Sequence, residues 1–177
     1  WIINQNIFTN LDNITSINPK LNGTIKIKYK EKKINQLHLK KANIFINFIN
    51  GDIKINKFYL LFNEGDFELK GFISNINGYK KLNFYITANL TNKKQILKTL
   101  NIKNDNNFKL PKTMYLDGYI NLPSYKINFN KILNDGNQLT QKDIKVYKNS
   151  LENLLINEGI VSFFDLKKVR NFITEIY

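Results

Sequence analysis

The sequence contains no cysteine, one histidine, one arginine and only three prolines. Without cysteine, the chain can form no disulfide, thiolate metal site or thiol nucleophile. The single histidine, His38, has no second histidine or cysteine with which to build a zinc site, and no serine pair can be argued for it. The glycines are scattered singly, so no phosphate-binding loop is present. We therefore expect no enzymatic activity and no cofactor or metal, with His38 solvated on the polar face of a strand.

Long hydrophobic runs are absent as well. No stretch of about 18 apolar residues occurs, which excludes a membrane-spanning helix. The sequence begins at Trp1 without a signal-peptide pattern, and we expect the targeting information to lie elsewhere in a longer protein. Its 177 residues are 42% hydrophobic and 23% charged, values that fit a folded domain rather than a disordered chain.

Negative charge is scarce: 14 acidic residues stand against 27 basic ones, for a net charge of +13. A basic chain raises the hypothesis of nucleic-acid binding. Arginine is the usual residue for bidentate contacts to phosphates and bases, however, and Arg170 is the only one. The chain also has 30 Asn and 26 Ile but two Ala and three Val, which indicates A/T-rich codons as one source of the lysines. We expect no specific nucleic-acid partner.

Residues 23–90 alternate between apolar and polar side chains, the pattern of strands with one buried face. Asn-Gly pairs at positions 50–51 and 77–78 predict hairpin turns, and charged segments at 31–33 and 63–66 predict two more. The alternation changes parity near Lys41 and near Asn56, which indicates bulges or short breaks. The pattern predicts six or seven strands here, in an antiparallel meander with one apolar face.

Beyond residue 90 the pattern predicts a short helix near 92–101, a loop ending at Pro111 and two further strands. Thr140 with Asp143 resembles a capping box and opens an amphipathic helix that Gly159 stops; another helix starts at Ser162 or Asp165. We expect these two helices to dock on the sheet through seven apolar side chains: Leu151, Leu154, Leu155, Leu166, Val169, Phe172 and Ile173.

The predicted fold class is mainly β, an open, curved antiparallel sheet with a few short helices, mostly toward the C-terminus. Residues 1–22 form a leading segment whose structure the sequence does not decide. Residues 23–133 form the sheet domain with its inserted helix, and residues 138–177 form the C-terminal helical pair that packs on the sheet.

The candidate functional feature is the apolar face of this sheet. Eight or nine strands about 4.8 Å apart give a sheet roughly 40 Å wide. Three helices about 10 Å across would cover roughly 30 Å of it. An open groove and a closed core are equal alternatives on this estimate. The carboxylates of Glu64, Asp66 and Glu68 lack the spacing of a calcium loop, and we expect a charged hairpin tip there.

Residues 22–74 also carry a motif order that resembles the AsmA-like superfamily of Gram-negative envelope proteins. Its most specific part is Gly51-Asp52-Ile53-Lys54-Ile55 followed by Gly65-Asp66-Phe67-Glu68-Leu69-Lys70-Gly71. The later order of strand 82–90, helix 95–100, loop and strand 114–122 matches too. The resemblance spans roughly residues 20–133, about two thirds of the chain, and rests on patterning rather than on chemistry.

The resemblance implies a non-catalytic β-groove that carries phospholipid acyl chains between the inner and outer membranes. It further implies a periplasmic location, an inner-membrane anchor outside this segment, and contact with further β repeats of the same full-length chain. The lipid-facing candidates are the alternating apolar residues Ile53, Ile55, Phe67, Leu69, Leu82, Phe84 and Ile86. The alternatives are a structural or adaptor module whose closed core binds other envelope proteins and, less favoured, a basic nucleic-acid-binding domain.

Overall fold

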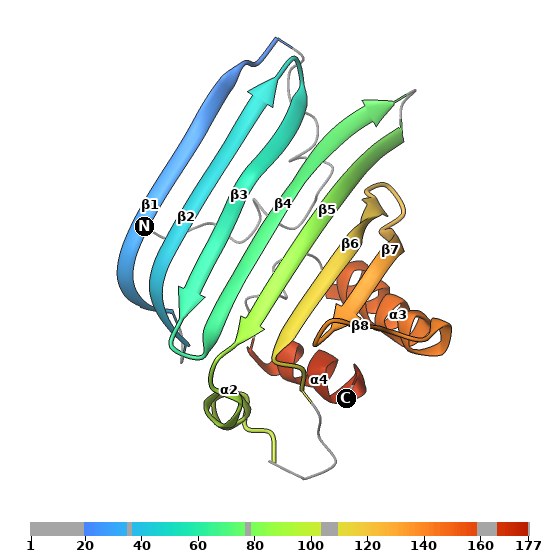
Figure 1. Ribbon diagram of the computed structural model, residues 1–177. Coiled ribbons are helices and arrows are strands. Elements are labelled where there is room, and N and C mark those ends of the chain that lie inside the picture. Colours follow the sequence, from blue (N-terminus) through green and yellow to red (C-terminus); the bar gives the residue numbers. More distant parts are fainter. Residues whose placement is uncertain (1–19, 35–36, 77–78, 104–109, 159–165, 177) are drawn as a thin grey trace.

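The computed structural model describes residues 20–34, 37–76, 79–103, 110–158 and 166–176. Eight strands form one open sheet in the order β1 to β8, each antiparallel to the strand before it (Figure 1). The mainly β fold with helices toward the C-terminus is confirmed. The strands are β1 (Gly23–Ile34), β2 (Leu37–Ile49), β3 (Asp52–Phe62), β4 (Gly65–Ile76), β5 (Tyr79–Leu90), β6 (Thr113–Asn121), β7 (Lys126–Asn134) and β8 (Asn137–Gln138).

Residues 23–90 form five long strands, so the prediction of six or seven was wrong. The parity changes are β-bulges inside continuous strands, where one extra residue faces a partner strand. Asn56 is the extra residue of β3, between the pairs Phe45–Lys57 and Ile46–Ile55. The expected turn at 31–33 was also wrong, because β1 continues to Ile34 and only Glu31 departs from extended backbone, with φ of 55°.

Two hairpin turns show why their short polar sequences were strong signals. Asn50 and Gly51 have φ of 51° and 86°, and Asp135 and Gly136 have φ of 50° and 80°. Positive φ at both central residues is the requirement of a type I′ turn, which Asn-Gly and Asp-Gly meet with little strain. The second Asn-Gly pair, residues 77–78, lies outside the described residues.

Three helices complete the described fold: α2 (Lys93–Thr99), α3 (Gln141–Glu158) and α4 (Leu166–Ile176). Asn92 caps α2, its Oδ1 accepting the Gln95 N–H at 3.1 Å. Thr140 forms the expected capping box, because its hydroxyl accepts the Asp143 N–H at 3.2 Å and donates to the carboxylate at 2.7 Å. The predicted stop at Gly159 and residues 1–19 of the leading segment lie outside the described residues.

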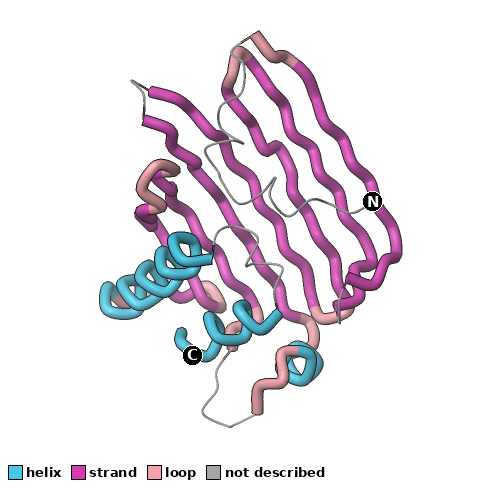
Figure 2. The backbone as a smooth tube through the Cα atoms, turned by 180° about the vertical axis from the view of Figure 1, so that it is seen from behind, coloured by secondary structure: helices cyan, strands magenta, loops and turns pink. Residues whose placement is uncertain are grey.

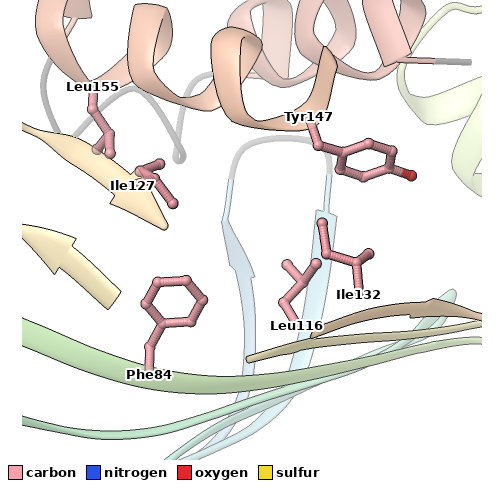
Figure 3. Close-up of a cluster of buried hydrophobic side chains, with 6 residues drawn as sticks. All are labelled: Phe84, Leu116, Ile127, Ile132, Tyr147 and Leu155. Atoms are coloured by element: carbon pink, nitrogen blue, oxygen red, sulfur yellow. The ribbon is translucent and has the colours of Figure 1, made fainter. Parts of the chain in front are cut away.

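Helices α3 and α4 lie on one side of the sheet and toward its β8 edge (Figure 2). Below α3 lies the main hydrophobic cluster, with two α3 side chains packed onto residues of β5, β6 and β7 (Figure 3). Its buried members are Phe84, Leu116, Ile127, Ile132, Tyr147 and Leu155. Ile176 of α4 packs against the same cluster. Isolated helices of this length are marginal in water, so packing is what holds them: α3 packs on β7, and α4 packs mainly on α3.

A buried carboxylate fixes α3 in register with β7. One oxygen of Glu152 accepts the Ile127 N–H at 2.7 Å, and the other contacts the Lys126 ammonium at 3.1 Å. The side chain of Glu152 is only 7% exposed. A buried carboxylate needs such partners, because desolvating it unpaired is costly. The interaction therefore specifies which turn of α3 meets β7.

Candidate functional site

The seven candidate residues lie on one face of the sheet, as the alternation predicts. The register aligns Ile53 with Ile73 and Leu82 across three strands. The next line contains Ile55, Gly71 and Phe84, followed by the pairs Leu69–Ile86 and Phe67–Ala88. Antiparallel partners point to the same face, so all seven side chains share it. Their contact with lipid stays a prediction.

The same register extends this face beyond the seven candidates. One unbroken apolar line crosses seven strands at right angles to them, through Ile27, Ile44, Phe58, Leu69, Ile86, Leu116 and Ile132. The apolar and polar positions of β3 exchange places in the sequence at Asn56. The bulge there takes up one extra residue, so that Phe58, like Ile55 before it, points to the apolar face. We call this surface the apolar face.

Part of the apolar face is covered. Phe84 is 4% exposed and lies in the cluster beneath α3, edge to face with Phe129 at 6.1 Å between ring centroids (Figure 3). Leu69 and Ile86 pack against that cluster and are partly buried. Phe84 is thus unavailable to a ligand while α3 is docked, and the sequence could not reveal this because it does not say where the helices lie.

Toward β1 the apolar face is not covered by a described helix (Figure 2). Ile25 and Ile27 of β1 are 44% and 48% exposed, although both belong to the apolar face. Phe58 and Phe67 form an edge-to-face pair at 6.5 Å on β3 and β4. Not all of this half is exposed, because Ala42 and the candidate Ile53 are both only 6% exposed on the same face. We call the other apolar residues of β1 to β4 on this face the open track. The sequence candidates omitted its β1 and β2 members, whose alternation is visible but whose alignment with β3 requires the register.

The opposite face is polar and cationic, with aromatic side chains among the lysines. The Lys26 ammonium lies 5.0 Å from the Phe45 ring centroid, and the Lys81 ammonium lies 3.9 Å from that of Tyr119. Lys70 pairs with Glu68 at 3.0 Å. Lys26, Lys70 and Lys81 thus make their contacts on the polar face rather than on the apolar face.

The acidic turn before β4 differs from the charged tip that we expected. Glu64 is buried at 4% exposure, and its backbone carbonyl accepts the N–H groups of Thr91 and Asn92. Asp66 accepts a hydrogen bond from the Asn89 side chain at 2.9 Å. This turn therefore fastens the start of α2 to the sheet. In the described part of the chain, no group of three histidine or acidic side chains could hold a metal ion.

Two tyrosines on the polar face have perturbed acidity. Partial burial raises the pKa of Tyr59, and the charges of Asp66 and Glu68 raise it further. Burial likewise raises the pKa of Tyr115, with a contribution from Asp117. Both phenols therefore stay protonated at neutral pH and cannot serve as bases there. The side chain of His38 lies outside those that the structure describes.

None of the described helices combines the length and the apolar character needed to cross a membrane. No protein-family model matches the chain, and no curated protein and no solved structure matches it either.

Proposed function

We propose that the chain is a non-catalytic β-groove of the AsmA-like kind, which holds phospholipid acyl chains on the open track. The observation that carries the proposal is the exposure of Ile25 and Ile27 on an otherwise continuous apolar face. Single exposed apolar residues are common, but Ile25 and Ile27 are next to each other on one face of β1 and continue an apolar surface, and contiguous apolar area of this kind is a feature of interaction sites. The motif order shared with AsmA-like proteins suggests a lipid as the ligand and the periplasm as the location.

The dimensions of the open track suit one acyl chain. Strands β1 to β4 are separated by three gaps of about 4.8 Å, so the track runs about 14 Å across them. Half of a bilayer's hydrocarbon core, the space of one acyl chain, is about 15 Å thick. A chain lying across the strands would follow the line Ile27, Ile44, Phe58 and Leu69, which is apolar at each position.

Apolar contact, rather than charge, should dominate the affinity. Each buried methylene contributes about 0.8 kcal/mol, so eight of them contribute about 6 kcal/mol before the cost of association. An exposed ion pair with a head group contributes about 0–1 kcal/mol. The lysines at the alternate positions, such as Lys54 and Lys70, point to the opposite face. We therefore expect weak head-group selectivity in the track.

The test places a photo-reactive phenylalanine at one of two positions of β4, in protein incubated with phospholipid vesicles. Phe67 belongs to the open track, whereas Phe72 lies on the polar face and is 44% exposed. The probe at position 67 should capture phospholipid, and the probe at 72 should not. Both variants replace a phenylalanine on the same strand, so differences in probe chemistry are removed. Equal capture at both positions, or capture at neither, would reject the groove.

A second candidate is an adaptor module that pairs with another protein through its sheet edge. The observation in its favour is β1, a 12-residue strand at the end of the sheet order. An edge strand of this length offers a template for strand addition. If the chain is such an adaptor, removing the residues before β1 or mutating β1 should abolish its binding to the partner protein. Photo-crosslinking of lipid at position 67 should then stay at background.

A further inference from the structure

Helix α2 follows β5 at one end of the sheet (Figure 1). A basic hollow lies along this helix and the residues just after it. Its volume is about 360 Å³, and its lining consists of Lys94, Leu97, Lys98, Asn101, Ile102 and Lys103. The three lysines are exposed, whereas Leu97 is buried at 1% exposure and forms apolar wall. The hollow thus combines three cations with two aliphatic side chains.

Of the three lysines that line the hollow, Lys98 lies in the last turn of α2, where a cation is favourable, and Lys103 lies beyond the helix. Lys94 occupies the first turn of α2, which has no acidic residue. The N-terminus of a helix carries partial positive charge, so cations there are unfavourable. Residues 91–103 include four lysines and no acidic residue. Ligand binding is a role that would offset this repulsion.

The nearby carboxylates do not neutralise the hollow by exposed charge. Glu64, beside the start of α2, is buried. Asp135, at the same end of the sheet, accepts the backbone N–H groups of Lys112 and Thr113, both at 2.8 Å. Within the described ranges, no carboxylate forms an ion pair with Lys94, Lys98 or Lys103.

We propose that this basic hollow docks the protein onto the surface of a bilayer that contains anionic phospholipid. The lysines would contact head-group phosphates, while the partly exposed Ile102 meets the glycerol region. Among the residues that the structure describes, no arginine and no aromatic side chain lines the hollow, although bidentate phosphate contacts and base stacking use those residues. The lining therefore fits a lipid surface better than a nucleic acid. This inference extends the proposed function. Docking on the bilayer does not depend on the groove, but the transfer of an acyl chain from the docked membrane to the open track does.

The experiment is co-sedimentation with vesicles of phosphatidylcholine alone or mixed equally with phosphatidylglycerol. The test variant is Lys94→Gln/Lys98→Gln/Lys103→Gln. The matched control, Lys28→Gln/Lys54→Gln/Lys131→Gln, removes the same charge from exposed positions on strands of the polar face. Near an anionic surface each lysine is worth roughly fivefold in affinity, so we expect about a 100-fold loss for the test variant. The control should lose less than tenfold, and high salt should release the wild type.

Each other result overturns docking through the hollow. Equal losses for the two triple variants would show attraction by net charge alone. Wild-type binding that is equal for both kinds of vesicle would show that anionic lipid is not recognised. If the protein binds duplex DNA more tightly than vesicles at the same salt concentration, and the test variant loses this DNA binding, the hollow is a nucleic-acid site. Binding of a fluorescent fatty acid in the absence of vesicles tests the groove separately. If the protein binds anionic vesicles but not the fatty acid, the proposed function is rejected and docking through the hollow is not.

Discussion

Phe84 lies between two glycines on the apolar face, because the register pairs it with Gly71 on β4 and Gly118 on β6. A Cβ atom built on Gly118 would lie 2.3 Å from the Asn128 carbonyl oxygen and 3.1 Å from Cζ of Phe84. The ring thus covers a position that has no room for a side chain. Glycine at position 118 therefore leaves room for the Phe84 ring and for the neighbouring backbone of β7.

Replacing Gly118 with alanine should destabilise the protein by about 1–3 kcal/mol, because the added methyl group overpacks the site. At roughly 2–4 °C per kcal/mol for a chain of this size, the melting temperature should fall by several degrees. Gly23→Ala is the control, since a Cβ there meets nothing within 4 Å. A melting temperature that is the same for both variants would contradict this account of residues 84 and 118.

At the scale of elements, the amphipathic pattern of α3 predicts that a helix forms, but it does not predict the rotation of that helix about its axis. The capping box and the apolar spacing correctly predicted the helix and its docking side. Leu154 and Leu155 both belong to that stripe, yet Leu155 is 3% exposed whereas Leu154 is only partly buried. The rotation of the helix is set by tertiary contacts, including the hydrogen bond from β7 to Glu152, which helix periodicity does not specify.

Truncating Leu155 to alanine should reduce the free energy of unfolding by about 2–5 kcal/mol, the range for a large buried aliphatic side chain. Ile156 is the neighbouring control, because it is 50% exposed and its truncation should change stability by about 0.5 kcal/mol or less. Urea unfolding of both variants measures the difference. If Ile156→Ala is the more destabilised, α3 is rotated from the orientation described.

Strand prediction succeeded and failed for a related reason. Alternation identified the apolar face correctly, because one residue of every two must face the core. The same alternation overcounted the strands, since a bulge such as that at Asn56 changes parity in one strand without ending its pairing. Which part of the face the helices cover depends on how residues distant in sequence pack together. That information lies in the register and in the docking of α3.

At the scale of the whole molecule, the two halves of the sheet differ in how far the helices cover the apolar face. The half that contains β5, β6 and β7 is packed against α3, and Ile132 there has no exposed surface. The half that contains β1 holds Ile27 on the same apolar line, at 48% exposure. One apolar line thus passes from a helix-covered core at Ile132 to an exposed isoleucine at Ile27.

An aspartate at either end of this line should therefore have opposite effects. Ile132→Asp buries an unpaired charge, and we expect a loss of several kcal/mol that leaves much of the protein unfolded. Ile27→Asp places its charge in water in the free protein, so stability should change by about 1 kcal/mol or less. The same charge would be desolvated under an acyl chain, and we expect fatty-acid affinity to fall at least tenfold. Thermal unfolding and titration with a fluorescent fatty acid measure the two effects. Unchanged affinity in a folded Ile27→Asp variant would show that the ligand does not reach β1, and the open track would lose its proposed role.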